Sequence, residues 1–181
     1  MSHPSELHSE KLPKTRDARF VSRPVNEADL AAIEALHDRV FGPGALTRAA
    51  YRVREGQPAF TPYCRVLFGD DVLVSALRFT AIQIGGTTGA VMLGPLAVAS
   101  EFANQGHGRL LVAEGLDAAR RAGVALVVLV GDAPYYARFG FVQAPRGQIL
   151  MPGPVDPARL LIAELAAGAA VRYQGRVTGV S

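Results

Sequence analysis

The chain contains a single cysteine, Cys64, among its 181 residues. One cysteine cannot form an intramolecular disulfide, the bond that stabilises many exported proteins. The first 17 residues lack the apolar segment of a signal peptide. Nowhere does the sequence reach the roughly 18 consecutive apolar residues of a membrane span. These absences predict a cytoplasmic protein that has no membrane partner.

Basic residues are present but are not clustered. The chain has 19 Lys and Arg against 16 Asp and Glu, a formal net charge of +3, and no lysine after Lys14. Proteins that bind nucleic acid usually concentrate arginines and exposed aromatic residues on one face. We therefore expect no nucleic-acid partner, whereas a mildly basic enzyme is suited to a polyanionic cofactor.

Several catalytic signatures are absent. A dinucleotide fingerprint that begins at Gly106 needs a glycine at position 111, which is Leu111, and no Gly-x-x-x-x-Gly-Lys-Ser/Thr segment exists. The four histidines show no metal-ligand spacing. No Gly-x-Ser-x-Gly segment or Cys/His pair supplies a covalent nucleophile. We expect neither NAD, ATP nor a metal ion, and no covalent intermediate.

Composition predicts one folded domain. With 49% hydrophobic residues, 181 positions are enough for one domain with a sizeable core and too few for two domains of ordinary size. Residues 1–18 are polar and lack apolar periodicity, so we expect a flexible N-terminal arm. A single domain is then expected over residues 19–181.

Hydrophobic periodicity predicts the first elements of that domain. Helical spacing begins after Asn26 and stops at Gly42, and Thr47 is expected to cap a second helix that ends at Glu55. Period-two patterns predict a first strand at 19–21 and an antiparallel meander of strands at 65–68, 72–84 and 90–98.

The second half of the pattern predicts a parallel crossover. A helix over 109–122 leads into an uninterrupted apolar run at 124–130, which suits a strand buried on both faces beside the strand at 90–98. Beyond it we expect a short helix from Ala133 to Gly140, strands at 141–142 and 148–151, and a helix from Asp156 to about Ala166.

The junction before the 109–122 helix has the composition of a phosphate site. It contains Gly106-His107-Gly108, directly ahead of the helical pattern. Glycine lets the backbone approach a ligand closely, and the first turn of a helix has unpaired N–H groups with partial positive charge. A diphosphate would fit this junction.

A second motif lies further along the chain. The segment Tyr135-Tyr136-Ala137-Arg138-Phe139-Gly140-Phe141 reads as a short aromatic helix ended by glycine. With Val98 and the glycine loop at 103–108 in register before it, the chain resembles the GNAT superfamily of acyl-CoA N-acyltransferases over about residues 19–151. The resemblance implies an α/β fold whose mixed sheet joins an antiparallel N-terminal meander to a parallel strand pair, with flanking helices.

The resemblance also implies an activity and a site. Acetyl-CoA would donate its acetyl group directly to a primary amine. The backbone N–H of Leu96 would polarise the thioester carbonyl beside a bulge that separates the parallel strands. Tyr136 would protonate the departing thiolate, while Tyr135 is expected to pack. The cofactor would contact the strand end and the loop through Leu96, Ala97, Val98, Ala103, Asn104, Gln105, Gly106, His107, Gly108 and Arg109.

Two positions depart from the family pattern. Ala103 stands where the family usually has Gln or Arg, and Ser100 where it often has Pro. The main donors of such a loop are backbone amides, which a side-chain substitution leaves in place. We therefore expect weaker cofactor binding and not its loss.

Some alternatives stay open at the level of sequence. Glu34 and His37 are candidates for the general base, as is a water molecule. The first two helices would form the acceptor groove, where a small-molecule or peptide amine binds: an amino acid, a polyamine, a drug or a protein amine. The alternative function is an acyl-CoA-binding sensor or interaction module with little or no catalysis. The resemblance also allows a homodimer through the C-terminal strands.

Overall fold

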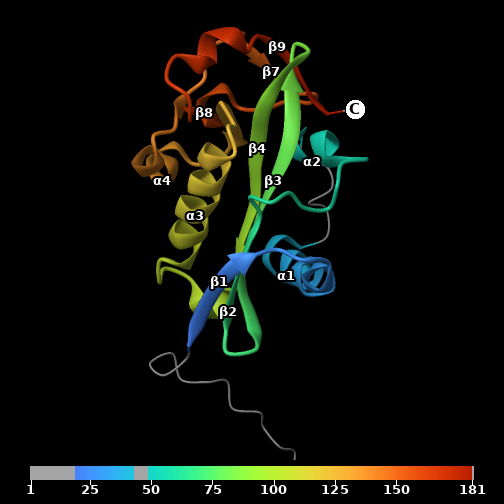
Figure 1. Cartoon of the computed structure of the whole chain (residues 1–181), viewed down its shortest axis with the longest axis vertical. Helices are drawn as coiled ribbons and strands as arrows, with labels where there is room; N and C mark the ends of the chain where they lie inside the picture. Colours follow the sequence, from blue (N-terminus) through green and yellow to red (C-terminus); the bar gives the residue numbers. More distant parts are fainter. Residues whose placement is uncertain (1–18, 43–48, 181) are drawn as a thin grey trace, which may run out of the picture.

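The structure is a computed structural model that describes residues 19–42 and 49–180. A nine-stranded sheet forms its centre, in the order β1-β2-β3-β4-β5-β8-β6, with β9 paired to β3 and β7. Helices α1 and α2 lie on one side of the sheet, and α3 and α4 lie on the other (Figure 1). The predicted arm at 1–18 and the predicted cap Thr47 lie outside the described residues.

The predicted antiparallel meander is confirmed. Its strands are β2 (Arg65–Gly69), β3 (Val72–Ile84) and β4 (Thr87–Val98). The predicted first strand is β1 (Phe20–Pro24), which pairs antiparallel with β2. The connection between β1 and β2 contains the 3-10 turn η1 (Glu27–Asp29) and the helices α1 (Leu30–Phe41) and α2 (Ala49–Arg54). The backbone N–H of Asn26 donates to Asp29 Oδ2 at 2.9 Å, which begins this helical segment where the sequence predicted.

The parallel crossover is also confirmed. From β4 the chain passes through the 3-10 turn η3 (Ser100–Phe102) and α3 (His107–Arg121) to β5 (Leu126–Val130). Strands β4 and β5 are parallel. Gly123, with φ +83°, follows the helix. Glycine adopts this backbone conformation without the steric penalty that other residues incur.

Short elements complete the chain. The predicted aromatic helix is α4 (Ala133–Tyr136), continued by the 3-10 turn η4 (Ala137–Phe139). The two predicted short strands are present as β6 (Val142–Gln143) and β7 (Ile149–Leu150). They are followed by the 3-10 turn η5 (Pro157–Arg159), β8 (Leu160–Glu164), the 3-10 turn η6 (Ala169–Arg172) and β9 (Gly175–Gly179).

The helix predicted from Asp156 to about Ala166 is wrong. Asp156 does cap a turn, since its Oδ1 accepts from the N–H of Ala158 at 2.9 Å, but the helical turn ends at Arg159. The next five residues form β8, which pairs antiparallel with both β5 and β6. A short apolar run fits either a helix or a strand by pattern alone, and here the open edge of β5 determines the outcome.

The last strand closes the far end of the β3–β4 hairpin. Strand β9 pairs antiparallel with β3 from Ile82 to Ile84 and parallel with β7. At the hairpin turn, Gly85 has φ +56°, and a Cβ there would overlap the carbonyl oxygen of Gln174. Glycine is therefore required at position 85 for both conformation and space.

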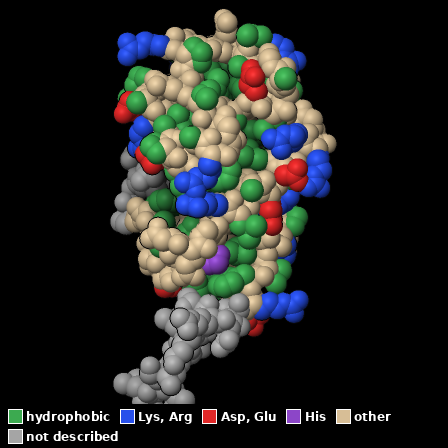
Figure 2. Space-filling model, turned by 90° about the vertical axis from the view of Figure 1, so that its left-hand side faces the viewer, with side chains coloured by type: hydrophobic (Ala, Val, Ile, Leu, Met, Phe, Trp, Pro, Cys, Tyr) green, Lys and Arg blue, Asp and Glu red, His purple; other side chains and the backbone are tan. Residues whose placement is uncertain are grey.

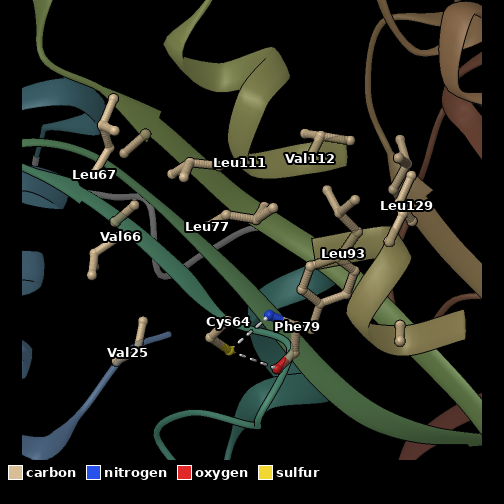
Figure 3. Packing of buried hydrophobic residues seen from close by; sticks show 14 of the residues in the cluster. Val25, Cys64, Val66, Leu67, Leu77, Phe79, Leu93, Leu111, Val112 and Leu129 are labelled. Atoms are coloured by element: carbon tan, nitrogen blue, oxygen red, sulfur yellow. Dashed lines mark hydrogen bonds between the residues drawn. The ribbon is translucent and has the colours of Figure 1, made fainter. Parts of the chain in front are cut away.

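The core fills both sides of the sheet. Between the sheet and α3, the side chains of Leu77, Phe79, Leu93 and Leu111 pack together (Figure 3). The buried thiol of Cys64 joins this layer, accepting from the N–H of Phe79 at 3.2 Å and donating to its carbonyl at 3.4 Å. A second cluster on the α2 side contains Val53, Ile82, Ile84, Met92 and residues of the C-terminal strands.

Candidate functional site

Strands β4 and β5 separate after a short ladder. They pair at three positions, ending at Met92 with Val128, although β4 continues to Val98. The register between β3 and β4 shifts where Leu77 pairs with Leu96 and Phe79 with Leu93, so β4 has an extra residue there. This is the bulge that was predicted beside Leu96. Within the described residues, the last six residues of β4 thus have no strand partner on the β5 side.

The loop before α3 presents a row of backbone donors. Asn104 and Gly106 have φ of +60° and +86°, which turns the chain sharply into the helix. The N–H of Leu110 bonds back to Gly106 O at 3.0 Å. The N–H groups of residues 104–109 donate to no acceptor in the described part of the chain. Together with the helix dipole, these groups form a site suited to an anion.

Gly108 brings this loop against the strand. A Cβ on Gly108 would stand 3.3 Å from side-chain carbons of both Leu96 and Val98, and 3.1 Å from the Tyr135 hydroxyl. The start of α3, the end of β4 and α4 therefore meet at this glycine. Ala97 alternates to the other face of the strand and is fully buried, and its carbonyl accepts from the Ser75 hydroxyl at 2.8 Å.

Tyr136 packs where β5 ends. Its ring lies edge-on to Tyr135 and to Phe141, with centroids 4.9 Å and 5.7 Å apart. Burial raises the pKa of Tyr136 to about 12, so the phenol keeps its proton at neutral pH. It can donate a proton in this state, and it cannot act as a base.

Tyr135 lies closer to the glycine loop than the sequence indicated. The pattern assigned it to packing, yet its hydroxyl reaches Gly108, and its ring lies 5.4 Å from the guanidinium of Arg138. Burial raises the pKa of Tyr135, while Arg109 and Arg138 act in the opposite direction. A signal for this contact was available, because a glycine in the first turn of a helix often marks a close approach.

His107 is half-buried, and its ring packs against two phenylalanine rings. Its ring lies 4.5 Å from that of Phe20 and 6.2 Å from that of Phe102, measured between centroids. Its Nε2 is buried and has no hydrogen-bond partner among the described residues. Burial lowers the pKa of His107, which favours the neutral imidazole. His107 can therefore bind a phosphate through its backbone N–H. The other predicted loop residues except Gly108 are exposed: Ala103, Asn104, Gln105, Gly106 and Arg109.

Positive charge gathers on the opposite side of β4. Arg54 of α2 approaches the bulge, since a Cβ on Gly94 would stand 3.4 Å from its Nη2. Burial lowers the pKa of His37 on α1, and the charges of Arg54 and Arg78 lower it further, with Asp38 opposing. Glu34, the other predicted base candidate, is exposed on α1.

Glu101, in the turn η3 that leads into the glycine loop, is exposed. Glu101 pairs with Arg39 at 3.6 Å and accepts from the Ser100 hydroxyl at 3.1 Å. On the face that carries α3 and α4, Arg side chains are spread among hydrophobic ones (Figure 2). Across residues 19–42 and 49–180, no group of three or more His, Cys, Asp or Glu is arranged to hold a metal ion. No helix in these ranges is long and apolar enough to cross a membrane.

Known proteins share this arrangement. Residues 22–144 match the family model of the acetyltransferase (GNAT) domain. The uncharacterised N-acetyltransferase YhbS of Escherichia coli K12 is 34% identical over 115 residues, covering 62% of this chain and 68% of YhbS.

Two solved structures extend the likeness. The crystal structure of YhbS from Escherichia coli in complex with CoA superimposes with a TM-score of 0.76 at 28% identity, covering 94% of this chain and 93% of that one. A GNAT family acetyltransferase from Brucella melitensis in complex with acetyl-CoA gives a TM-score of 0.59 at 27% identity, covering 84% and 98%.

Proposed function

Because the chain belongs to the GNAT acetyltransferase family, we propose that it transfers an acetyl group from acetyl-CoA directly to a primary amine. The observation that carries the proposal is the separation of β4 from β5 beside the row of N–H donors that begins α3. The CoA and acetyl-CoA complexes of the two similar structures support it.

The donor side of the site would hold the cofactor in two parts. The N–H groups of residues 104–109 bind the diphosphate, with Ala103 at the start of the loop. The unpaired edge of β4 along Leu96, Ala97 and Val98 binds the pantetheine, where a strand partner would otherwise hydrogen-bond. Gly108 keeps the two parts together, because a side chain there would press on Leu96 and Val98.

The chemistry then needs a polarised carbonyl and a protonated leaving group. Acetyl-CoA supplies the acetyl group as a thioester. The N–H of Leu96 donates to the thioester oxygen and stabilises the negative charge that develops there. As the new C–N bond forms and the C–S bond breaks, Tyr136 gives its phenolic proton to the departing sulfur.

The acceptor side must receive the amine without its extra proton. His37 lies on this side among positive charges, and its lowered pKa favours the neutral form that accepts a proton. We assign His37 as the general base, which accepts the proton of the attacking amine directly or through a water molecule.

The test measures binding and turnover separately. Calorimetric titration with acetyl-CoA reports binding, and thiol release across a panel of primary amines reports transfer. Binding together with amine-dependent thiol release is the expected result. Tight binding without thiol release for any amine would overturn the transferase proposal and favour an acyl-CoA sensor.

A further inference from the structure

The acceptor side of β4 is lined by two arginines and a histidine from three elements. Arg54 comes from α2, Arg78 from β3 and His37 from α1, and the charges of both arginines act on His37. Arg54 lies against Gly94, two residues before the N–H of Leu96 that would polarise the thioester. Whatever amine reaches Leu96 from this side meets this cluster, which we call the arginine wall: His37, Arg54 and Arg78.

Arg78 is half-buried and has no carboxylate partner among the described residues. Its Nη2 donates to the carbonyl of Pro58 at 2.9 Å, while its Nε is buried and has no hydrogen-bond partner. Burial lowers the pKa of its guanidinium. The ion pairs Arg23–Asp29, Arg39–Glu101 and Arg121–Asp117 do not involve Arg78. A guanidinium that is partly removed from water and has an unpaired donor is stabilised by an anionic ligand.

A second polar group on the same strand face lacks a partner. Thr80 follows Arg78 by two residues on β3, so the two side chains point to the same side of the sheet. Thr80 is 2% exposed, and its hydroxyl has no hydrogen-bond partner in the described part of the chain. Buried hydroxyls in proteins nearly always have partners. An arginine and a hydroxyl on one strand face together suit an oxyanion.

We propose that the acceptor is an amine that carries a carboxylate or a phosphate, and that Arg54 and Arg78 bind this anionic group beside Gly94. The inference rests on the proposed transferase function and names its substrate class. A guanidinium matches either oxyanion with paired hydrogen bonds. Polyamines are disfavoured by the same wall, because like charges repel them there.

The experiment compares amines that differ only in the anionic group. Amino acids are paired with their amides, and phosphoethanolamine is paired with ethanolamine. We expect kcat/KM for the anionic member to exceed that of its neutral partner by about tenfold or more, the size of a charge-assisted hydrogen bond. A preference within the first pairs identifies a carboxylate, and a preference within the last pair identifies a phosphate.

Substitutions locate the preference. Arg78→Gln keeps a donor for the Pro58 carbonyl and removes the charge, and Arg54→Gln removes the charge beside Gly94. Each is expected to narrow the ratio of kcat/KM between the paired amines, mainly through a higher KM for the anionic member. Arg52→Gln is the matched control, because Arg52 lies on the same helix with its side chain exposed, donating to Pro152 O. It should leave the ratio unchanged.

Calorimetry on the enzyme–CoA complex adds a readout that does not need turnover. If anionic amines bind this complex and Arg78→Gln weakens the binding, the anion site stands even where transfer fails. Equal kcat/KM within every pair would overturn the anion site and leave the transferase proposal intact. The anion site would also be overturned if no anionic amine bound the complex and none was acetylated.

Discussion

The ring of Tyr136 lies directly against Gly131, the residue that follows β5. A Cβ on Gly131 would stand 2.6 Å from Cε2 of the ring and 2.9 Å from Leu129 Cδ1. Real Cβ atoms do not approach so closely, so the ring occupies a position that only glycine at 131 allows. The end of the strand thereby sets where the proposed acid sits.

Replacing Gly131 by alanine should therefore impair catalysis through Tyr136. We expect Gly131→Ala to lower kcat at least about tenfold, because small displacements of catalytic groups are costly. The affinity for acetyl-CoA should change less. The double variant with Tyr136→Phe provides the check, since it should be no slower than Tyr136→Phe alone. Additive losses in kcat would show that Gly131 acts by another route.

Removing the Tyr136 hydroxyl should affect turnover and not binding. Tyr136→Phe keeps the ring and its packing, and loss of a general acid lowers kcat about 100-fold or more. Tyr173→Phe is the control, because that hydroxyl donates to Thr88 O, away from the glycine loop. Tyr135→Phe should raise KM for acetyl-CoA more than it lowers kcat, given its contact with Gly108. Equal kcat in the Tyr136 and Tyr173 variants would remove Tyr136 from the mechanism.

The buried phenol of Tyr136 predicts a loss of stability in alkali. Its pKa rises from 10.0 to about 12 on folding, so the unfolded chain loses this proton first as the pH rises. The protonated phenol's contribution to the free energy of unfolding is fully present below pH 10. It is lost between about pH 10 and 12, which lowers the free energy of unfolding by at most about 3 kcal/mol. Urea unfolding at several pH values measures it. In Tyr136→Phe the decline over this range should be shallower, and identical slopes would contradict the burial argument.

The glycine loop can be tested by linkage. Acetyl-CoA at a hundred times its Kd should stabilise the protein by about 2.7 kcal/mol. Gly106→Asp should abolish that gain, because it places a negative charge among the N–H donors. Gly123→Asp is matched, since Gly106 and Gly123 both have positive φ and open space around a Cβ. It should lower the melting temperature of the free protein yet retain the shift with acetyl-CoA. A preserved shift in Gly106→Asp would move the phosphate site elsewhere.

The elements that could be predicted are those whose caps and hydrophobic periodicity lie within their own segment of sequence. The cap at Asn26, the glycines that end α1, α3 and η4, and the apolar run of β5 each carry their own signal. β8 and β9 did not, because their conformation comes from strands distant in sequence: β5 and β6 for β8, and β3 and β7 for β9. Local preference in the segment after Asp156 favoured a helix, and the sheet edge overrode it.

The candidate site divides in the same way. The N–H donors before α3 followed from Gly106 and Gly108, because backbone geometry at a helix start is predictable. The hydroxyl of Tyr135 at Gly108 and the convergence of Arg54 and Arg78 near His37 were not predictable. They depend on how α4, α2 and β3 pack against one another, and single residues on separate elements share no spacing that a sequence reveals.

The pairing of β9 with β3 has a consequence for how the molecule is made. Residues 82–84 leave the ribosome long before residues 177–179, which become their neighbours in the sheet. Until then the far end of the longest hairpin has an open edge, and an open edge on a nascent chain invites pairing with other chains. Contacts of such sequence separation also slow folding. We expect the proposed acyl-CoA loop, built from residues close together in sequence, to take shape before that end of the sheet is closed.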